Sequence, residues 1–505
     1  MINAKSPRQT SACPPALSLC DKCRAVAVAP FMAFSLFGLI LAALLFPSDS
    51  LADSTPPNVL FIMVDDLNCR LGCYGDPIAH TPNIDRLAQR GVRFDRAYTQ
   101  APQCNPSRTS LLCGKYPSTT RIYENDTPSR AFLGPAAVFL PEFFQANGYF
   151  TGKVGKIPHG SFDDEVRWDF NELTPGDSEG LSGGEKPKKD KGKDKERERM
   201  LPEAVAWRPL KENEKDTPDG YTARATAKLI DERAAKPFFI AAGFHKPHRP
   251  YEAPSKYFAR YPADKMPLPQ EPPDVRKGVP PIAFDTYDDD ANMPDEYKRF
   301  GIAAYYACIE FIDAQVGILL DALERNKVSD RTIVVLLSDH GYLLGEHGGM
   351  WRKMSLFEEA TRIPLIIVAP GKKAGGTCER TVESVDLYPT LAQLCGLKYS
   401  PDLEGHSLIP LLDDPTAPWT YAAHTFTQHA LTKRQAVVGE SVRTERWRYT
   451  EWGTDGEQGT ELYDHDNDPK EWHNLAQDAK YADVIAGLRK QLIPVAQPPP
   501  LPKKH

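Results

Sequence analysis

The chain has 505 residues and a formal net charge of −7, with 41% hydrophobic and 26% charged residues. This composition is ordinary for a globular enzyme and excludes a disordered or fibrous chain. The acidic balance gives no electrostatic footprint for nucleic acid, so we expect no nucleic-acid partner. A chain of this length predicts one large α/β domain and a second, smaller one.

The N-terminus has the pattern of an export signal. Basic residues precede a long apolar run at residues 25–46, and Ser50-Leu51-Ala52 supplies small residues for cleavage. We therefore expect residues 1–52 to be a signal peptide and the protein to be periplasmic or extracellular. Because the apolar run is also long enough to span a bilayer, an uncleaved anchor stays open, and we expect no other membrane contact.

Several apolar, β-branched runs end in polar residues. They lie at 58–64, before Asp65-Asp66; at 148–151, leading to Lys156 and His159; at 237–242, leading to His245 and His248; and at 332–337, before Asp339-His340. With helical patterns at 83–91, 303–325 and 387–394, these runs predict buried strands of a mainly parallel sheet. Ligands collect at the carboxyl ends of such strands, so we expect one site built from these polar residues.

Two further segments differ in composition. Residues 184–199 have mixed charge and no apolar side chain, which predicts a mobile insertion near 176–199 within a catalytic domain at 53–412. Short aromatic runs at 447–452 and 461–463, followed by a helical pattern at 481–493, predict a C-terminal subdomain at 413–505. We expect it to be an antiparallel sheet capped by a helix.

Asp65 and Asp66 form a pair of hard oxygen ligands suited to Ca²⁺ or Mg²⁺, although adjacent acids also cap helices. Asp339 and His340 at a second strand end favour the metal, because one ion could bridge the two ends. We predict Ca²⁺, with Mg²⁺ possible, at a site of these four residues. Histidine is the less usual ligand for a hard cation.

Residues 103–114 carry the strongest local signal. Pro106 suits the first turn of a helix and Gly114 suits its end, which places Cys104 at the helix N-terminus. The partial positive charge there favours a thiolate or polarises a carbonyl. Arg108, one turn on, reaches the same face. From these residues alone, both a thiol nucleophile and a buried structural cysteine stay open.

Seven cysteines follow the signal segment, and an odd number in an exported protein leaves at least one unpaired or used in chemistry. Cys308 lies in a helical pattern and Cys395 lies among leucines. We expect both to be small buried apolar residues.

Cys104-x-Pro106-Ser107-Arg108, closing on Gly114, resembles the signature at which sulfatases have a cysteine oxidised to formylglycine. Cys113 replaces the usual Thr or Gly. The segment 148–156 resembles the family's Gly-Tyr-x-Thr-x-x-x-Gly-Lys, which selects Lys156 rather than Lys153. The resemblance to type I (formylglycine-dependent) sulfatases covers about residues 57–492. It implies an alkaline-phosphatase/sulfatase-like α/β fold: a large, mainly parallel sheet flanked by helices, with a smaller C-terminal antiparallel sheet.

Within this family the chain is most similar to the iduronate-2-sulfatase branch. Asp339-His340 stands where most sulfatases have Asp-Asn, and His159 follows Lys156 by three residues. The segments 244–250 and 345–348 are also similar. Lys353 falls one residue later than in that pattern.

The resemblance implies a mechanism with a role for each matched residue. A maturation enzyme converts Cys104 to formylglycine, and one hydroxyl of its hydrate attacks sulfur while the second later expels sulfate. The hydrate and the four metal-site residues hold the ion. Arg108 and Lys156 steady the hydrate, Lys353 neutralises sulfate oxygens, His159 is the base, and His248 is the acid. His245 is either a neighbour of the sulfate or a histidine buried against Pro247, and His347 supports its loop.

We therefore predict a sulfuric ester hydrolase that acts on sulfated uronate-containing glycans, as in glycosaminoglycan degradation. Lys246, Arg249 and Arg352 are the candidates for binding the uronate carboxylate, and a bidentate arginine would select it most sharply. Two alternatives remain. One is a phosphonate or phosphate ester hydrolase of the same superfamily, and the other is a non-catalytic protein that binds sulfated glycans.

Overall fold

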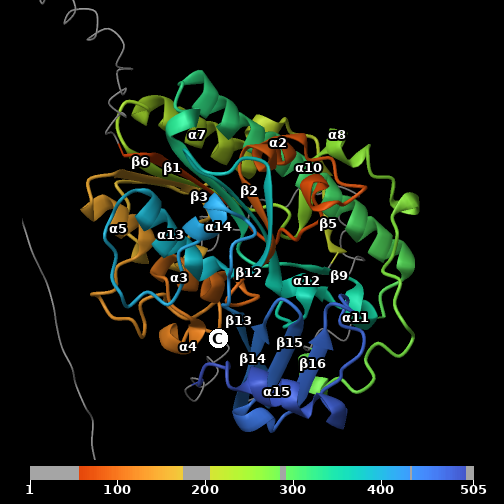
Figure 1. Cartoon of the computed structure of the whole chain (residues 1–505). Helices are drawn as coiled ribbons and strands as arrows, with labels where there is room; N and C mark the ends of the chain where they lie inside the picture. Colours follow the sequence, from red (N-terminus) through yellow and green to blue (C-terminus); the bar gives the residue numbers. More distant parts are fainter. Residues whose placement is uncertain (1–55, 175–204, 285–291, 433–434, 496–505) are drawn as a thin grey trace, which may run out of the picture. The chain divides into compact units, whose positions relative to one another are not determined.

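The computed structural model describes residues 56–174, 205–284, 292–432 and 435–495 (Figure 1). The expected signal peptide at 1–52 and the charged insertion near 176–199 lie outside the described residues. So does the end of the expected C-terminal subdomain, from residue 496 onward.

The larger sheet has eight strands in the order β12-β2-β11-β8-β1-β6-β3-β4. Only β11 runs antiparallel to its neighbours in this sheet, so the mainly parallel prediction is confirmed. The strands span β1 Asn58–Val64, β2 Val92–Tyr98, β3 Phe150–Gly155, β4 Phe170–Glu172, β6 Phe238–Phe244, β8 Thr332–Ser338, β11 Arg362–Val368 and β12 Gly376–Glu383.

The register brings the expected strand ends to one level. Val64 at the end of β1 lies opposite Phe244 of β6 and Ser338 of β8. Gly155 at the end of β3 lies opposite Gly243 of β6. The residues that follow each strand therefore leave the sheet along the same edge. This edge collects the polar side chains named above.

Helices cover both faces of this sheet (Figure 1). Alternate residues of β1 divide between the faces: Leu60, Ile62 and Val64 join one apolar cluster, and Val59, Phe61 and Met63 join the other. Each such buried side chain contributes about 1.5–3 kcal/mol. The first face carries α2 Pro82–Arg90, α7 Pro218–Arg233, α8 Ser255–Phe258 and α10 Asp295–Arg325; the second carries α3 Cys104–Cys113, α5 Leu140–Ala146, α13 Leu387–Leu394 and α14 Ile409–Asp413.

Several expected elements have different bounds, and two of these differences have a clear cause. The helix expected at 303–325 begins earlier, at Asp295, because its polar first turn carries Asp295 and Glu296, acids that favour a helix N-terminus. The strand expected at 148–151 begins at Phe150 and runs to Gly155, since Gly148 has a φ of 85° in the turn after α5. Among the described residues, α10 alone is long and apolar enough to cross a membrane, and it is mostly buried as a core helix.

A second, four-stranded antiparallel sheet follows, as expected. It contains β13 Ala423–Thr432, β14 Gln435–Arg443, β15 Trp447–Trp452 and β16 Thr460–Asp464, paired in sequence order. The helix α15 Ala482–Arg489, shorter than expected, packs Leu488 against Val442, Tyr449 and Leu462. The amide of Phe426 donates to the carbonyl of Gln100 at 2.9 Å, which joins this sheet to the segment before α3.

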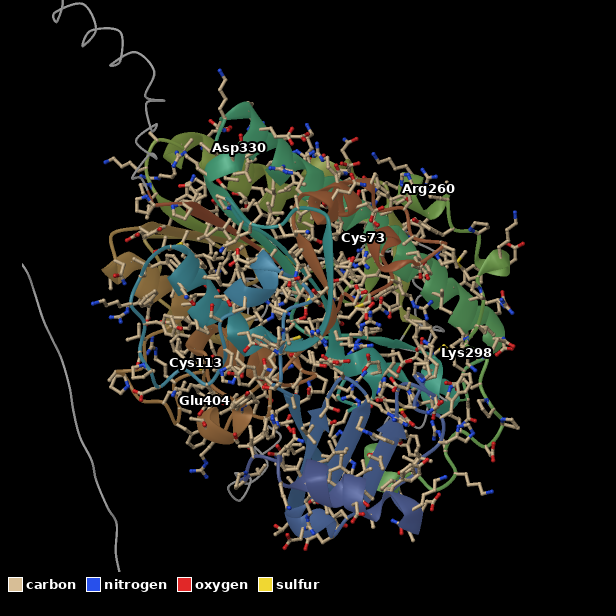
Figure 2. All side chains as sticks on the ribbon, in the orientation of Figure 1. Cys73, Cys113, Arg260, Lys298, Asp330 and Glu404 are labelled. Atoms are coloured by element: carbon tan, nitrogen blue, oxygen red, sulfur yellow. The ribbon has the colours of Figure 1, made fainter. Side chains whose placement is uncertain are left out.

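Shorter elements complete the described chain, and side chains fill the space between the layers (Figure 2). They are α4 Pro117–Thr120, β5 Trp207–Leu210, β7 Tyr251–Pro254, β9 Leu343–Leu344, α11 Glu346–Gly349, β10 Trp351–Arg352 and α12 Glu358–Thr361, with 3₁₀ turns at Gly72–Tyr74, Gly160–Glu165, Glu214–Asp216, Ala263–Lys265, Pro281–Ala283, Ser329–Arg331, Ser384–Asp386, Thr454–Gly456 and Ala479–Tyr481. Cys308 and Cys395 are buried, as expected.

Candidate active site

Cys104 is the first residue of α3, and the helix ends before Gly114, whose φ is 67°. All ten residues of α3 are buried, so the helix is held rigidly beneath the strand ends. Four side chains surround the thiol Sγ: Lys353 Nζ at 3.2 Å, Asp65 Oδ1 at 3.3 Å, His340 Nε2 at 3.4 Å and Lys156 Nζ at 3.7 Å. The structure thus assembles residues from five distant parts of the sequence.

The expected thiolate at this helix N-terminus is not what the surroundings favour. Burial and the charge of Asp65 raise the pKa of the Cys104 thiol to about 12, against the opposing effect of Lys156 and Lys353. The thiol is neutral near pH 7, so these surroundings disfavour an unmodified thiolate nucleophile.

Asp65 and Asp66 leave the end of β1 in different directions. Asp65 accepts from the Lys156 ammonium, and its Oδ1 lies 3.6 Å from the Arg108 guanidinium. Burial opposes ionisation of Asp65, but Lys156, His248 and Arg108 together hold its pKa well below the ordinary value. Asp66 Oδ1 lies 2.5 Å from Lys353 Nζ, while its buried Oδ2 has no hydrogen-bond partner among the described residues.

Asp339 and His340 follow β8. Asp339 accepts from Arg108 Nε at 2.8 Å and from the Asp66 amide at 3.2 Å. His340 Nδ1 lies 3.0 Å from the Gly341 carbonyl, which can accept only from a protonated Nδ1. Burial lowers the pKa of His340. The neutral ring therefore presents the lone pair of Nε2 to the carboxylates.

These donors fit a divalent cation. Ligand atoms of Asp65, Cys104, Asp339 and His340 lie within 4.8 Å of one another, and so do those of Asp65, Asp66, Cys104 and His248. Three carboxylates dominate the set, and the unbonded Asp66 Oδ2 leaves one oxygen ready to coordinate. Oxygen-rich donor sets of this kind suit Ca²⁺ or Mg²⁺.

Three cations border the carboxylates. Arg108 donates from NH1 to the carbonyls of Lys156 at 2.6 Å and Ile157 at 2.9 Å, which fixes the chain after β3. The pKa of Lys353 is raised well above its ordinary value because Asp66 outweighs the effect of burial. The pKa of Lys156 is also raised, because the charge of Asp65 outweighs the effect of burial. Lys153, by contrast, pairs with Asp163 at 2.7 Å, so Lys156 is the lysine beside Cys104.

His159 and His248 lie near this centre as neutral rings. Burial and the neighbouring cations Lys156 and Arg108 lower the pKa of His159 to about 3, and within the described part of the chain its buried Nδ1 has no hydrogen-bond partner. Burial also lowers the pKa of His248 well below the ordinary value. The Nδ1 of His248 lies 2.6 Å from the Arg249 carbonyl.

The candidate substrate-binding residues, which follow β6 or lie on β10, have different surroundings. Lys246 Nζ donates to the carbonyls of His248 at 3.1 Å and Pro250 at 2.7 Å, so its charge shapes its own loop. His245 lies on the same loop, Arg249 follows His248, and Arg352 pairs with Leu343 between β10 and β9. His347 supports its loop by bonding Glu359 at 2.9 Å and stacking on Phe357.

Two residues that position these groups were not predicted from the sequence. Asp219, buried in the first turn of α7, accepts from the amides of His245 at 2.6 Å and Lys246 at 3.2 Å. Tyr305 of α10 donates to the Asp66 carbonyl at 2.6 Å and accepts from the Asn68 amide at 2.9 Å. Asp219 gave no local signal, and Tyr305 fitted a helical core pattern.

Fold and site together are those of an alkaline-phosphatase-like α/β protein with a carboxylate-rich group of side chains around Cys104. The Sulfatase family model matches residues 57–397, and the model for the C-terminal region of N-sulphoglucosamine sulphohydrolase matches residues 345–497. Iduronate 2-sulfatase of Mus musculus is 31% identical, covering 90% of this chain and 97% of its own. A sulfatase of Formosa agariphila is 34% identical, covering 87% and 86%. The chain belongs to the sulfatase family.

Solved structures agree on the fold. A 2-O GAG sulfatase superposes with a TM-score of 0.68 at 25% identity, covering 86% of this chain and 90% of its own. A phosphonate monoester hydrolase of Agrobacterium radiobacter superposes with a TM-score of 0.71 at 24% identity, covering 86% and 94%. At this identity, the likeness to the phosphonate monoester hydrolase shows a shared fold and no more.

Proposed function

We propose that the protein is an exported sulfatase that hydrolyses sulfate esters of uronate-containing glycans, with formylglycine made from Cys104 by a maturation enzyme. The observation that carries this proposal is the position of Cys104. Its side chain lies at a helix N-terminus, within 3.7 Å of a carboxylate, an imidazole and two ammonium groups. A geminal diol at this position would meet groups that orient it and stabilise charge on a sulfate ester.

The surrounding residues supply each chemical requirement of the reaction. One hydroxyl of the diol attacks sulfur, and the glycan alcohol leaves. The remaining hydroxyl then loses its proton, the aldehyde forms again, and sulfate is released. Asp65, Asp66, Asp339 and His340 would hold a divalent ion, which supplies Lewis-acid polarisation when bound. Lys353 and Lys156 compensate the negative charge that collects on the sulfate oxygens.

Two histidines move the protons. Burial and the neighbouring cations keep His159 neutral, so its ring has a lone pair for the proton of the second hydroxyl. The negative charge of a bound sulfate ester would raise its pKa toward the value that a base needs. His248 is also neutral, and its donation to the leaving oxygen requires prior protonation. A dianionic sulfated uronate beside the ring would raise the pKa of His248 and thereby favour the protonated acid.

The choice of a uronate rests on the likeness to the iduronate 2-sulfatase of Mus musculus and on two arginines near the site. Lys246 donates to two carbonyls of its loop. Arg249 follows His248 and Arg352 precedes Lys353 in the chain, which makes these two guanidinium groups the candidates for the carboxylate. A guanidinium can bind a carboxylate through two parallel hydrogen bonds, which a neutral group cannot match.

Steady-state kinetics on paired substrates test this proposal. Arg249→Gln and Arg352→Gln should each raise KM about 10- to 100-fold for a sulfated uronate and much less for a neutral aryl sulfate. Arg260→Gln is the matched control, because Arg260 pairs with Glu310 at 3.0 Å outside the site (Figure 2). Equal losses on both substrates would refute uronate recognition. Faster hydrolysis of a phosphonate monoester than of every sulfate ester would refute the sulfatase assignment.

A further inference from the structure

A cavity of about 580 Å³ lies apart from the candidate active site, and none of the proposed catalytic residues lines it. Strands of the larger sheet contribute Arg96 from β2 and Arg362 from β11, and the smaller sheet contributes Arg443 from the end of β14. Cys69, in the segment that follows β1, also lines this cavity. Cavities of this size accommodate a small molecule.

Most acids that line this cavity are already bonded within the protein. Asp76 accepts from the Tyr306 hydroxyl at 2.8 Å, and Glu379 is exposed. The other four have cationic partners: Asp95 with Arg93 at 2.7 Å, Glu346 with Arg70 at 2.7 Å, Glu358 with Arg448 at 2.6 Å and Glu359 with His347 at 2.9 Å. These acids therefore have little capacity left for a further cation.

Arg362 is different. Within the part of the chain that the structure describes, its guanidinium makes no hydrogen bond and no ion pair, and its Nε is shielded from solvent. Arg362 lies opposite Tyr98 in the β11–β2 register, and the guanidinium of Arg443 lies 5.6 Å from the ring of Tyr98. A buried Nε donor without an acceptor is costly, and an oxyanion that accepts from this Nε and a neighbouring Nη in parallel removes that cost.

We propose that this cavity is an oxyanion-binding site, distinct from the active site, with Arg362 as its principal ligand. The bound group is a sulfate-like oxyanion, either the free ion or a sulfate carried on a sugar. Arg96, which also lines the cavity, donates from Nη1 to the backbone carbonyl of Glu379 at 2.9 Å and adds a second positive charge. The volume exceeds that of the ion alone, so it leaves room for a sugar ring.

The rate at which Cys69 is alkylated reports on binding in this cavity and does not depend on turnover at the active site. It is partly exposed and lines the cavity. Burial raises the pKa of its thiol to about 11, and the nearby charge of Arg362 opposes that rise. An oxyanion bound to Arg362 would obstruct the thiol and offset the guanidinium charge, and both effects slow alkylation.

The experiment measures the rate at which iodoacetamide labels Cys69 in the full chain, by peptide mass spectrometry, with sodium sulfate or with chloride at equal ionic strength. Sulfate should slow labelling of Cys69 several-fold and leave Cys73 unchanged, because Cys73 is partly exposed but does not line the cavity. Arg362→Met should abolish the protection. A sulfated monosaccharide that protects at lower concentration than sulfate, when its unsulfated sugar does not, identifies a sugar-borne group; equal potency identifies the free ion.

Two results would overturn the proposal: labelling of Cys69 at the same rate in sulfate and chloride, or full protection retained in an Arg362→Met protein with unchanged Tm. If Arg362→Met does not fold, Arg96→Met takes its place. Arg96→Met should weaken protection measurably, and undiminished protection in this variant would contradict the site.

Discussion

Asp66 contributes to the site through both its backbone conformation and its carboxylate. Its φ of 61° lies in the left-handed region, which costs about 1–2 kcal/mol for most residues and less for Asp or Asn. The amide of Asp66 donates to Asp339 Oδ1, and its carbonyl accepts from the Tyr305 hydroxyl, so two contacts hold this conformation. The result is a second carboxylate beside Cys104, with one oxygen left unbonded.

The Lys353 ammonium should matter for turnover more than for stability. It lies 2.5 Å from Asp66 Oδ1 and 3.2 Å from the Cys104 thiol, where charge on a sulfate ester would collect. We predict that Lys353→Met lowers kcat by about 10²- to 10³-fold, the usual cost of losing one group that stabilises developing charge.

Lys372→Met is the control for this variant, because Lys372 pairs with the surface residue Asp413 at 2.7 Å. Stopped assays of sulfate release on both variants provide the measurement. A Lys353→Met enzyme with the kcat of the Lys372→Met enzyme would remove Lys353 from the proposed chemistry.

At the level of single residues, the sequence predicted side chains that follow a recognisable strand or motif. Asp65, Asp339 and Lys156 belong to this group. Asp219 lies far from the site in sequence, and only the packing of α7 beside β6 brings it to the amides of His245 and Lys246. Such contacts depend on tertiary structure, for which one sequence contains no periodic signal.

Gly243 shows how the strands themselves position the site. A Cβ at this residue would lie 2.1 Å from the Lys156 carbonyl, so β6 and the end of β3 approach as closely as they do only because residue 243 has no side chain. We predict that Gly243→Ala displaces Lys156, lowers kcat at least tenfold and destabilises the fold by about 1–3 kcal/mol.

Gly487→Ala in α15 is the matched control, since a Cβ there meets nothing within 4 Å. That change should leave kcat unaltered and raise stability slightly, because alanine is the better helix former. Urea unfolding and turnover of the two variants measure both effects. An active, stable Gly243→Ala protein would show that this close approach is not required.

Glu461 of β16 should make stability depend on pH. Burial raises its pKa to about 7, although Trp452 and Tyr463 donate to it. The folded state then binds more protons than the unfolded state between about pH 4.5 and 7, so stability falls as pH rises through that window. The loss is at most about 3 kcal/mol.

Glu461→Gln, which stays neutral, should lack this contribution. We expect the difference in Tm between wild type and Glu461→Gln to move in favour of the variant as the pH rises from 4.5 to 8. A difference that stays constant over this range would mean that Glu461 is ionised throughout in the folded protein.

At the level of elements, the type of each strongly patterned segment followed from the sequence, whereas some bounds did not. The run at 58–64 is apolar throughout because helices cover both faces of the sheet, and its observed bounds are the same. The start of α10 was placed too late because residues 295–300 are mostly polar and lack apolar periodicity. The order of the strands depends on crossovers that local patterns do not encode.

For the whole molecule, the proposed metal site joins segments that are hundreds of residues apart. Asp65, Cys104 and Asp339 meet only in the folded chain, so an ion bound among them stabilises the folded state by mass action. At 1,000 times its Kd this amounts to about 4 kcal/mol. We predict that chelation lowers Tm by several degrees and abolishes turnover, and that Ca²⁺ or Mg²⁺ restores both.

Differential scanning calorimetry with elemental analysis measures this effect, and Asp339→Asn should show a smaller shift on chelation. Stoichiometric zinc, with activity restored by zinc alone, would contradict a site of hard oxygen ligands. An unchanged Tm after complete chelation would contradict metal binding among these residues.

The most direct test of the proposed function relates sulfate release to the state of Cys104. Preparations made with increasing amounts of a maturation enzyme are compared by the fraction of Cys104 peptide that carries an aldehyde in place of the thiol. We predict that the rate of sulfate release rises in proportion to this fraction and extrapolates to zero when Cys104 is unmodified. Full sulfate release by a preparation in which Cys104 remains a thiol would contradict the proposed mechanism.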